Sequence, residues 1–296
     1  MIEEKLNQQI NFFNNDTLYV LYSGTSLELE EDAFRHLNDL YLMHLMLIRK
    51  GVNSVNITLS IDLDIFELID EKTNNKKYND LTFKEFFEKN STIIDINDFE
   101  KSFNRKEKDL IFISSGHGEI HGLHNGKNNT YISSDYFENL ALPEYRTILL
   151  MSQCIAGSFH HLDTRKNICV IGASEYQSSL SLDLQSMCKI FGSKQQEYYN
   201  LLSFFNGVAI NPFLFSFFMV SLYSNQLLAY NKNKNLIHIY KYTASSTYNY
   251  LQNVQNKIDF ELVTHEGKSY IQSGYKNIIQ VPYLLNKILA SRLLFN

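Results

Sequence analysis

The 296-residue chain contains no tryptophan, only three prolines and only three cysteines. Cys154, Cys169 and Cys188 have neither the paired spacing of a disulfide framework nor that of a metal site, and so low a count favours a reducing compartment. The net charge of −5 comes without a long basic block, which argues against nucleic-acid binding. The opening stretch MIEEKLNQQINFF is polar and acidic and lacks the apolar segment that a signal peptide requires. We therefore expect a cytoplasmic protein, while secretion by a signal-independent route stays open.

Long hydrophobic runs are also scarce. The longest, VAINPFLFSFFMVSLY at 208–223, contains Asn211-Pro212 and is shorter than the roughly 20 residues that a membrane-spanning helix needs. We expect it to form a buried core helix, with a peripheral membrane contact as the minor alternative, and we expect no integral membrane segment. Apolar residues make up 44% of the chain, enough for a substantial core.

Apolar segments that end in small or polar residues recur along the chain. They are continuous rather than alternating, and helical patterns lie between them, which indicates a mainly parallel sheet covered on both faces. The sequence thus predicts an α/β sandwich, with residues 1–230 as one domain and 231–296 as a C-terminal extension packed on it. The expected strands are 17–22, 54–62, 109–118, 147–157 and 167–174, and the expected helices are 28–50, 81–90, 98–106 and one near 245–257.

Two reactive side chains follow successive strands of this expected sheet. His117 lies between two glycines in SSGHG, and Cys154 follows the run TILLMSQ. A cysteine nucleophile requires a thiolate, which a nearby imidazole can generate or stabilise. A cysteine at a strand end is more often a small buried apolar residue, but the pair on adjacent strand ends favours catalysis. Gly116 and Gly118 would let substrate approach the histidine, and Gly157, with its neighbours Ile155 and Ala156, would offer backbone N–H groups near the sulfur.

The motifs SSGHG and SQCIAGSF resemble the caspase-like fold of cysteine peptidases, and the small-x-Cys-x-x-Gly-Ser pattern is most similar to the legumain family, peptidase C13. The segments LYVLYSGTS, FRHLNDLYLMHLMLIRKGV and NITLSID resemble the legumain opening, with Arg35-His36 on the family's Arg-His. The segment ASEYQSSLS resembles a pocket wall of legumains. The resemblance covers about residues 17–183 in short motifs.

This resemblance implies a three-layer α/β/α caspase-like fold and a cysteine endopeptidase that cleaves proteins or peptides without a cofactor or metal. Cys154 would attack the scissile carbonyl, His117 would protonate the leaving amine, and the backbone N–H groups of Gly118 and Cys154 would bind the oxyanion. Arg35 would favour Asn or Asp before the cleaved bond. The resemblance places the following residues in the substrate pocket: Arg35, His36, Gln153, Ser178 and Ser179.

The chain departs from the family pattern at three positions. Gly116 stands where legumains have Asp before His-Gly, and Ala33 stands where an asparagine helps to orient the histidine. Gln153 replaces a glutamate found in some relatives, which weakens the expectation of a preference for asparagine.

Several alternatives stay open at this point. A zinc site could use Cys154 with His117, His121, His124, His160 and His161, although their spacing matches no standard structural site. A non-catalytic scaffold and a transpeptidase of the same fold are the others. An activating partner or self-processing at the Asn-rich segments 72–80 and 124–130 would provide regulation.

Overall fold

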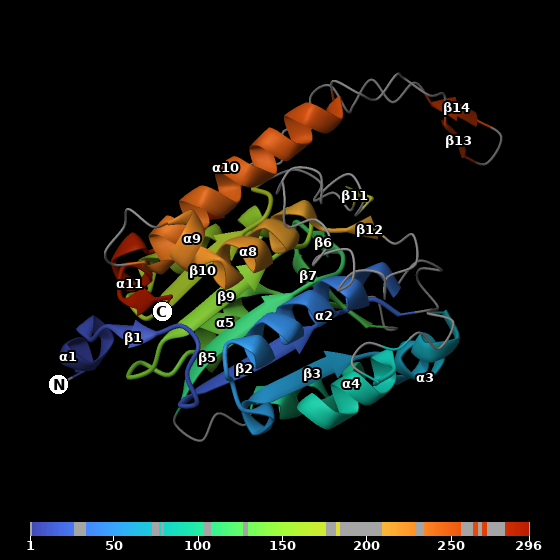
Figure 1. The fold of residues 1–296 in the computed structure, drawn as a ribbon. Helices are drawn as coiled ribbons and strands as arrows, with labels where there is room; N and C mark the ends of the chain where they lie inside the picture. Colours follow the sequence, from blue (N-terminus) through green and yellow to red (C-terminus); the bar gives the residue numbers. More distant parts are fainter. Residues whose placement is uncertain are drawn as a thin grey trace.

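The computed structural model describes residues 2–26, 34–72, 77, 80–103, 108–126, 130–175, 182–183, 209–228, 234–255, 263–265, 268–270 and 282–295. Figure 1 shows the arrangement of the elements in this part of the chain.

A seven-stranded sheet forms the centre of the molecule. Its strands lie in the order β15-β10-β9-β5-β2-β3-β4, and all pair in parallel except β15, which is antiparallel to β10. The strands are β2 (Thr17–Tyr22), β3 (Ile57–Ile61), β4 (Thr92–Asp95), β5 (Asp109–Ser114), β9 (Thr147–Met151), β10 (Ile168–Gly172) and β15 (Tyr283–Leu284). The predicted mainly parallel sheet is therefore confirmed.

Helices cover both faces of the sheet (Figure 1). They enclose two separate hydrophobic cores, one on each face. Alternate residues of a strand point to opposite faces, so Tyr19 and Leu21 join one core while Leu18 and Val20 join the other. One face carries α2 (Phe34–Arg49), α3 (Leu63–Lys72), α4 (Phe83–Asn90), α8 (Pro212–Leu222) and α10 (Leu236–Gln255). The other carries the 3-10 helix η2 (Ile96–Phe103), α5 (Ser134–Leu140) and the 3-10 helix η4 (Ala156–Thr164). The protein is thus an α/β sandwich, as predicted.

Smaller elements surround this sheet. They are α1 (Ile2–Asn7), η1 (Ser54–Asn56), α9 (Ser224–Leu227), α11 (Lys287–Ala290) and four minor sheets. These sheets pair β1 (Ile10–Asn11) with β16 (Leu293–Leu294), β11 (Leu182–Asp183) with β12 (Ala209–Ile210) and β13 (Val263–His265) with β14 (Lys268–Tyr270), and join β6 (Gly118–Glu119), β7 (Gly122–Asn125) and β8 (Thr130–Ile132).

Element boundaries differ from the sequence prediction at several points. The expected strands 109–118, 147–157 and 167–174 end earlier, at Ser114, Met151 and Gly172. The expected strand 54–62 begins as the 3-10 turn η1, because the Asn53 side chain accepts from the backbone N–H of Val55 and closes the turn. The expected helix 98–106 is the 3-10 helix η2, which starts at Ile96. Helix α10 begins at Leu236, earlier than predicted. Residues 28–33 of the expected helix 28–50 lie outside the described residues, and α2 covers Phe34–Arg49.

Within the apolar run 208–223, residues Pro212–Leu222 form the buried helix α8, as expected, and Ala209–Ile210 form β12. Asn211 caps its first turn by accepting from the backbone N–H groups of Phe213 and Leu214, and Pro212 occupies the first helical position. In the part of the chain that the structure describes, no helix combines the length and apolarity needed to cross a membrane.

The C-terminal residues contribute to the central sheet. Strand β15 pairs with β10 through Tyr283 and Leu284, and β16 pairs with β1 near the start of the chain. Residues 282–295 therefore pack against the sheet that precedes them in the sequence.

Candidate functional site

His117 and Cys154 lie beyond the carboxyl ends of the adjacent strands β5 and β9. The sheet is built outward from β2 in both directions, with β3 and β4 on one side and β5, β9 and β10 on the other. In open α/β sheets the crevice beyond the strand ends at such a reversal point is the usual ligand site. His117 follows β5, one of the two strands at this reversal point, and Cys154 follows its neighbour β9.

The backbone of the His117 loop lies directly against the turn that carries Cys154. A Cβ atom added to Gly118 would be 2.3 Å from Cγ of Gln153 and 2.5 Å from the carbonyl oxygen of Cys154. Contacts that short exclude any side chain at position 118, so glycine allows the two loops to pack together. Both His117 and Cys154 are half-buried, which leaves part of each side chain accessible.

Hydrogen bonds hold both loops to the strand ends. The Ser115 N–H donates to Tyr22 O at 2.9 Å, and the Ser152 N–H donates to Ser114 O at 3.3 Å. The Ser114 hydroxyl donates to Oε1 of Gln153 at 2.8 Å, and Gln153 is only 1% exposed. The Gln153 side chain, expected to contact substrate, is therefore directed into the end of the sheet and supports the turn.

The turn after Cys154 is tight. Ile155 adopts the left-handed conformation, with φ 50° and ψ 39°, and η4 begins at the next residue. The Gly157 N–H donates to Glu175 O at 2.6 Å, so it is bonded within the protein. The expectation that Gly157 offers its N–H near the sulfur is wrong, because the chain following β10 accepts it. The backbone N–H groups of Gly118 and Cys154 remain the predicted oxyanion donors.

The other described cysteine is chemically different. Cys169 is fully buried in β10, its thiol donates to Leu285 O at 3.2 Å, and burial raises its pKa well above the ordinary value. A thiol that does not ionise is a poor nucleophile. Of these two cysteines, the accessible one is Cys154.

Arg35 and His36, at the start of α2, reach the histidine loop. The rings of His36 and His117 meet edge to face, with centroids 5.5 Å apart. Arg35 Nε donates to His36 Nε2 at 3.3 Å, and His36 Nδ1 lies 3.1 Å from the Ser115 hydroxyl oxygen. The two residues that sequence reasoning assigned to a substrate pocket therefore lie beside the predicted catalytic histidine.

A buried carboxylate ends this chain of contacts. The Ser115 hydroxyl donates to Oδ2 of Asp39 at 2.7 Å, and the backbone N–H of Asn211 donates to Oδ1 at 2.8 Å. Burial raises the pKa of Asp39 to about 7, against the opposing effects of the Ser115 and Asn211 hydrogen bonds and of the Arg35 charge. Asp39 thus changes charge near neutral pH.

The C-terminal strand supports the Cys154 turn. The Tyr283 hydroxyl donates to Ala156 O at 2.5 Å, and its ring meets His160 edge to face with centroids 4.5 Å apart. His160 also lies 3.5 Å from a carboxylate oxygen of Glu175. Residues after 230 therefore help to shape the site.

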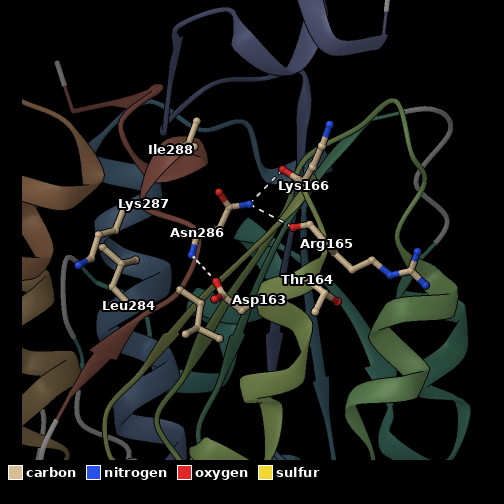
Figure 2. A pocket seen from close by; sticks show the side chains of 9 residues that line it. Asp163, Thr164, Arg165, Lys166, Leu284, Asn286, Lys287 and Ile288 are labelled. Atoms are coloured by element: carbon tan, nitrogen blue, oxygen red, sulfur yellow. Dashed lines mark hydrogen bonds between the residues drawn. The ribbon is translucent and has the colours of Figure 1, made fainter.

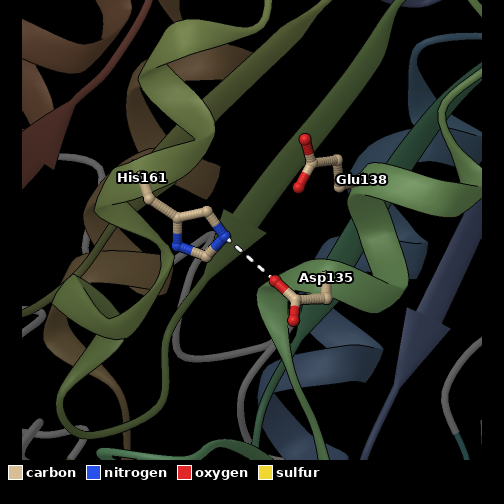
Figure 3. A group of neighbouring side chains, drawn as sticks. All are labelled: Asp135, Glu138 and His161. Carbon is tan, nitrogen blue, oxygen red and sulfur yellow. Dashed lines mark ion pairs between the residues drawn. The ribbon is translucent and has the colours of Figure 1, made fainter.

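The proposed zinc ligands do not gather into one site. Among the described residues, the group whose possible ligand atoms all lie within 4.8 Å of one another is Asp135, Glu138 and His161 (Figure 3). His161 Nε2 lies 3.4 Å from Asp135 Oδ1, while Glu138 accepts from Arg165 Nε at 2.6 Å. Because an arginine already compensates the Glu138 carboxylate, this surface group has the character of an ion-pair cluster.

A cavity of about 520 Å³ lies at the opposite end of β10 from the candidate site (Figure 2). Asn286 lines this cavity. Its side-chain amide donates to the backbone oxygens of Arg165, Lys166 and Ile168. Its backbone N–H donates to Oδ1 of Asp163. These bonds fix the C-terminal segment to the residues that precede and begin β10.

Some expected residues lie outside the described residues. They are Ser178 and Ser179 of the expected pocket wall, Cys188, and Ala33 at the position of the orienting asparagine. Sequence reasoning in turn missed Asp39, Asn211 and Tyr283. The available signal for Asp39 was an aspartate on the same helical face as Leu42, Met43 and Met46, which follow it by three, four and seven residues.

No protein-family model matches the chain, and a search of curated proteins finds none that matches it. The function must therefore be argued from the site itself.

Proposed function

We propose that the protein is a cysteine peptidase of the caspase-like fold, with Cys154 as nucleophile and His117 as its acid–base partner. The observation that carries this proposal is the packing of the His117 loop on the Cys154 turn at adjacent strand ends, with no room for a side chain at Gly118. The partial accessibility of Cys154, in contrast to the buried Cys169, supports it.

The reaction proceeds through a thioester. The Cys154 thiolate attacks the carbonyl carbon, a C–S bond forms, and the oxyanion accepts from the backbone N–H groups of Gly118 and Cys154. The C–N bond then breaks, and the imidazolium of His117 gives its proton to the leaving amine. Water attacks the thioester while His117 takes a proton from it, which releases the carboxylic acid and restores the thiolate–imidazolium pair.

Arg35 provides the selectivity in this proposal. A guanidinium offers paired donors to a planar carboxylate or amide, so an Asn or Asp side chain before the cleaved bond matches it. The contact between His36 and His117 supports a position for Arg35 close to the reacting atoms.

Peptide cleavage tests the proposal. Wild-type protein is incubated with a mixture of peptides of varied sequence, and mass spectrometry identifies the cleaved bonds. We expect cleavage after Asn or Asp, and no cleavage by Cys154→Ala or His117→Ala. If a peptide with a free amino terminus is added as an acceptor, products in which the acyl fragment is joined to that amine would indicate transpeptidation. Intact peptides with folded wild-type protein would contradict the proposal and favour a non-catalytic scaffold.

A further inference from the structure

A directed chain of hydrogen bonds runs from Arg35 to Asp39 beneath the candidate site. Arg35 Nε can only donate, so His36 Nε2 accepts and the neutral imidazole carries its proton on Nδ1. Nδ1–H then donates to the Ser115 oxygen, and the Ser115 hydroxyl donates to Asp39. Every donor in this chain points toward the carboxylate.

The direction depends on the charge of Asp39. An ionised carboxylate only accepts, which fixes the Ser115 hydroxyl as a donor to it. A protonated Asp39, or an asparagine in its place, presents a donor to Ser115. The Ser115 hydroxyl then turns toward His36 Nδ1, the imidazole proton moves to Nε2, and Nε2–H faces the Arg35 Nε–H.

The chain is also connected to the cysteine turn. Asn211 donates its backbone N–H to Asp39 and its side-chain amide to Ser152 O at 3.3 Å, two residues before Cys154. Its side-chain oxygen caps α8. The network therefore joins three segments that are far apart in the sequence.

We propose that Asp39 is a positioning residue that, through Ser115 and His36, sets the orientation of the Arg35 guanidinium and so controls the selection of acidic or amide side chains in the substrate. This inference rests on the proposed peptidase function. Arg35 touches the substrate in this account, whereas Asp39 acts only through its neighbours.

The relay gives the selectivity a pH dependence. The groups that face this chain and can carry charge include Arg35 and His36 of α2 and His117 of the β5 loop. Because burial raises the pKa of Asp39 to about 7, ionised Asp39 and oriented Arg35 predominate above that pH. Selectivity for Asn over Ala should therefore fall as the pH decreases through 7.

The test compares two fluorogenic peptides that are identical except for Asn or Ala before the cleaved bond. The measured quantity is the ratio of their kcat/KM values in wild type, Asp39→Asn, Ser115→Ala, Arg35→Ala and the double variant Arg35→Ala/Asp39→Asn. We expect Asp39→Asn and Ser115→Ala to lower the ratio by roughly tenfold or more, as misplacement of a binding group does. In the Arg35→Ala background, Asp39→Asn should change the ratio no further.

Asp62→Asn is the matched control. Asp62 is a buried aspartate, 2% exposed, at the carboxyl end of β3, and it accepts from the backbone N–H of Asp64 at the start of α3. Its replacement should leave the ratio and its pH dependence as in wild type. A ratio unaltered in Asp39→Asn, or losses that add in the double variant, would overturn the proposal.

A second readout is independent of catalysis. Nitrogen-15 NMR of the His36 imidazole, assigned with His36→Phe, reports which ring nitrogen carries the proton. At pH 8 we expect the Nδ1–H tautomer in wild type and the Nε2–H tautomer in Asp39→Asn. The same tautomer in both proteins would refute the relay. Failure to cleave either peptide would count against the peptidase function, and the nitrogen spectra would then decide the relay alone.

Discussion

Replacement of Asp39 by Asn should make the protein more stable at neutral and alkaline pH while it damages the site. Burial raises the pKa of Asp39 from an ordinary value of 3.8 to about 7, so the folded state holds a proton that the unfolded state has released. Between pH 3.8 and about pH 7 the wild-type free energy of unfolding therefore falls as the pH rises. The stability that this proton provides is present in full only below pH 3.8.

The magnitude follows from the same pKa values. Each pKa unit corresponds to about 1.4 kcal/mol, so the ionisation of Asp39 lowers the wild-type free energy of unfolding by about 4 kcal/mol between pH 4 and pH 7. Asp39→Asn has no such proton to lose. The difference in unfolding free energy, variant minus wild type, should therefore increase by about 4 kcal/mol across this range and stay constant above it.

Urea unfolding at a series of pH values between 4 and 9 measures this difference, with circular dichroism as the signal because the chain has no tryptophan. Ser115→Ala is an informative companion, since it removes a hydrogen bond that lowers the Asp39 pKa. In that variant the fall in stability should extend to higher pH than in wild type. A variant-minus-wild-type difference that stays flat within about 1 kcal/mol would refute the assignment of a neutral buried carboxyl group.

Other substitutions test the packing around the site and at the opposite end of the sheet. Gly118→Ala should abolish peptide cleavage, because its Cβ overlaps the Cys154 carbonyl oxygen, and retained activity would contradict the contact between the loops. Tyr283→Phe leaves the buried Ala156 oxygen without its donor, so we expect a loss of about 1–3 kcal/mol in urea unfolding together with a lower kcat. Arg146→Met removes the guanidinium donor from Oδ2 of Asp109 and from two backbone oxygens, those of Lys5 and Gln8, while Oδ1 of Asp109 keeps the backbone N–H of residue 146. We expect a loss of about 3–5 kcal/mol in urea unfolding, and an effect below 1 kcal/mol would show that this buried ion pair is unimportant.

The main strands could be predicted from the sequence because each is a continuous apolar run that ends in small or polar residues. Val20 and Leu149 lie in such runs and are fully buried. The error at 54–62 arose from side-chain hydrogen bonds that local patterns do not reveal. The Asn56 amide donates to Asn15 O, and this long-range contact holds a turn where the apolar pattern suggested a strand.

The candidate pair was predictable for a related reason, since the carboxyl ends of parallel strands meet at one edge of the sheet. The supporting network was not. Ser115 and Asn211 are 76 and 172 residues from Asp39 in the sequence, and only the fold brings them together. Tyr283 likewise reaches the site through an antiparallel strand that no motif in the sequence announced.

Covalent labelling of Cys154 is the most direct test of the proposed function. Purified wild type, Cys154→Ala and His117→Ala are treated with acyloxymethyl ketone probes that carry Asn, Asp, Arg or Lys at the reactive position, and intact mass is measured. We predict one adduct on wild type with the Asn or Asp probe and none on Cys154→Ala. Equal labelling of wild type and Cys154→Ala, or no adduct with any probe on a folded wild-type protein, would contradict a peptidase centred on Cys154.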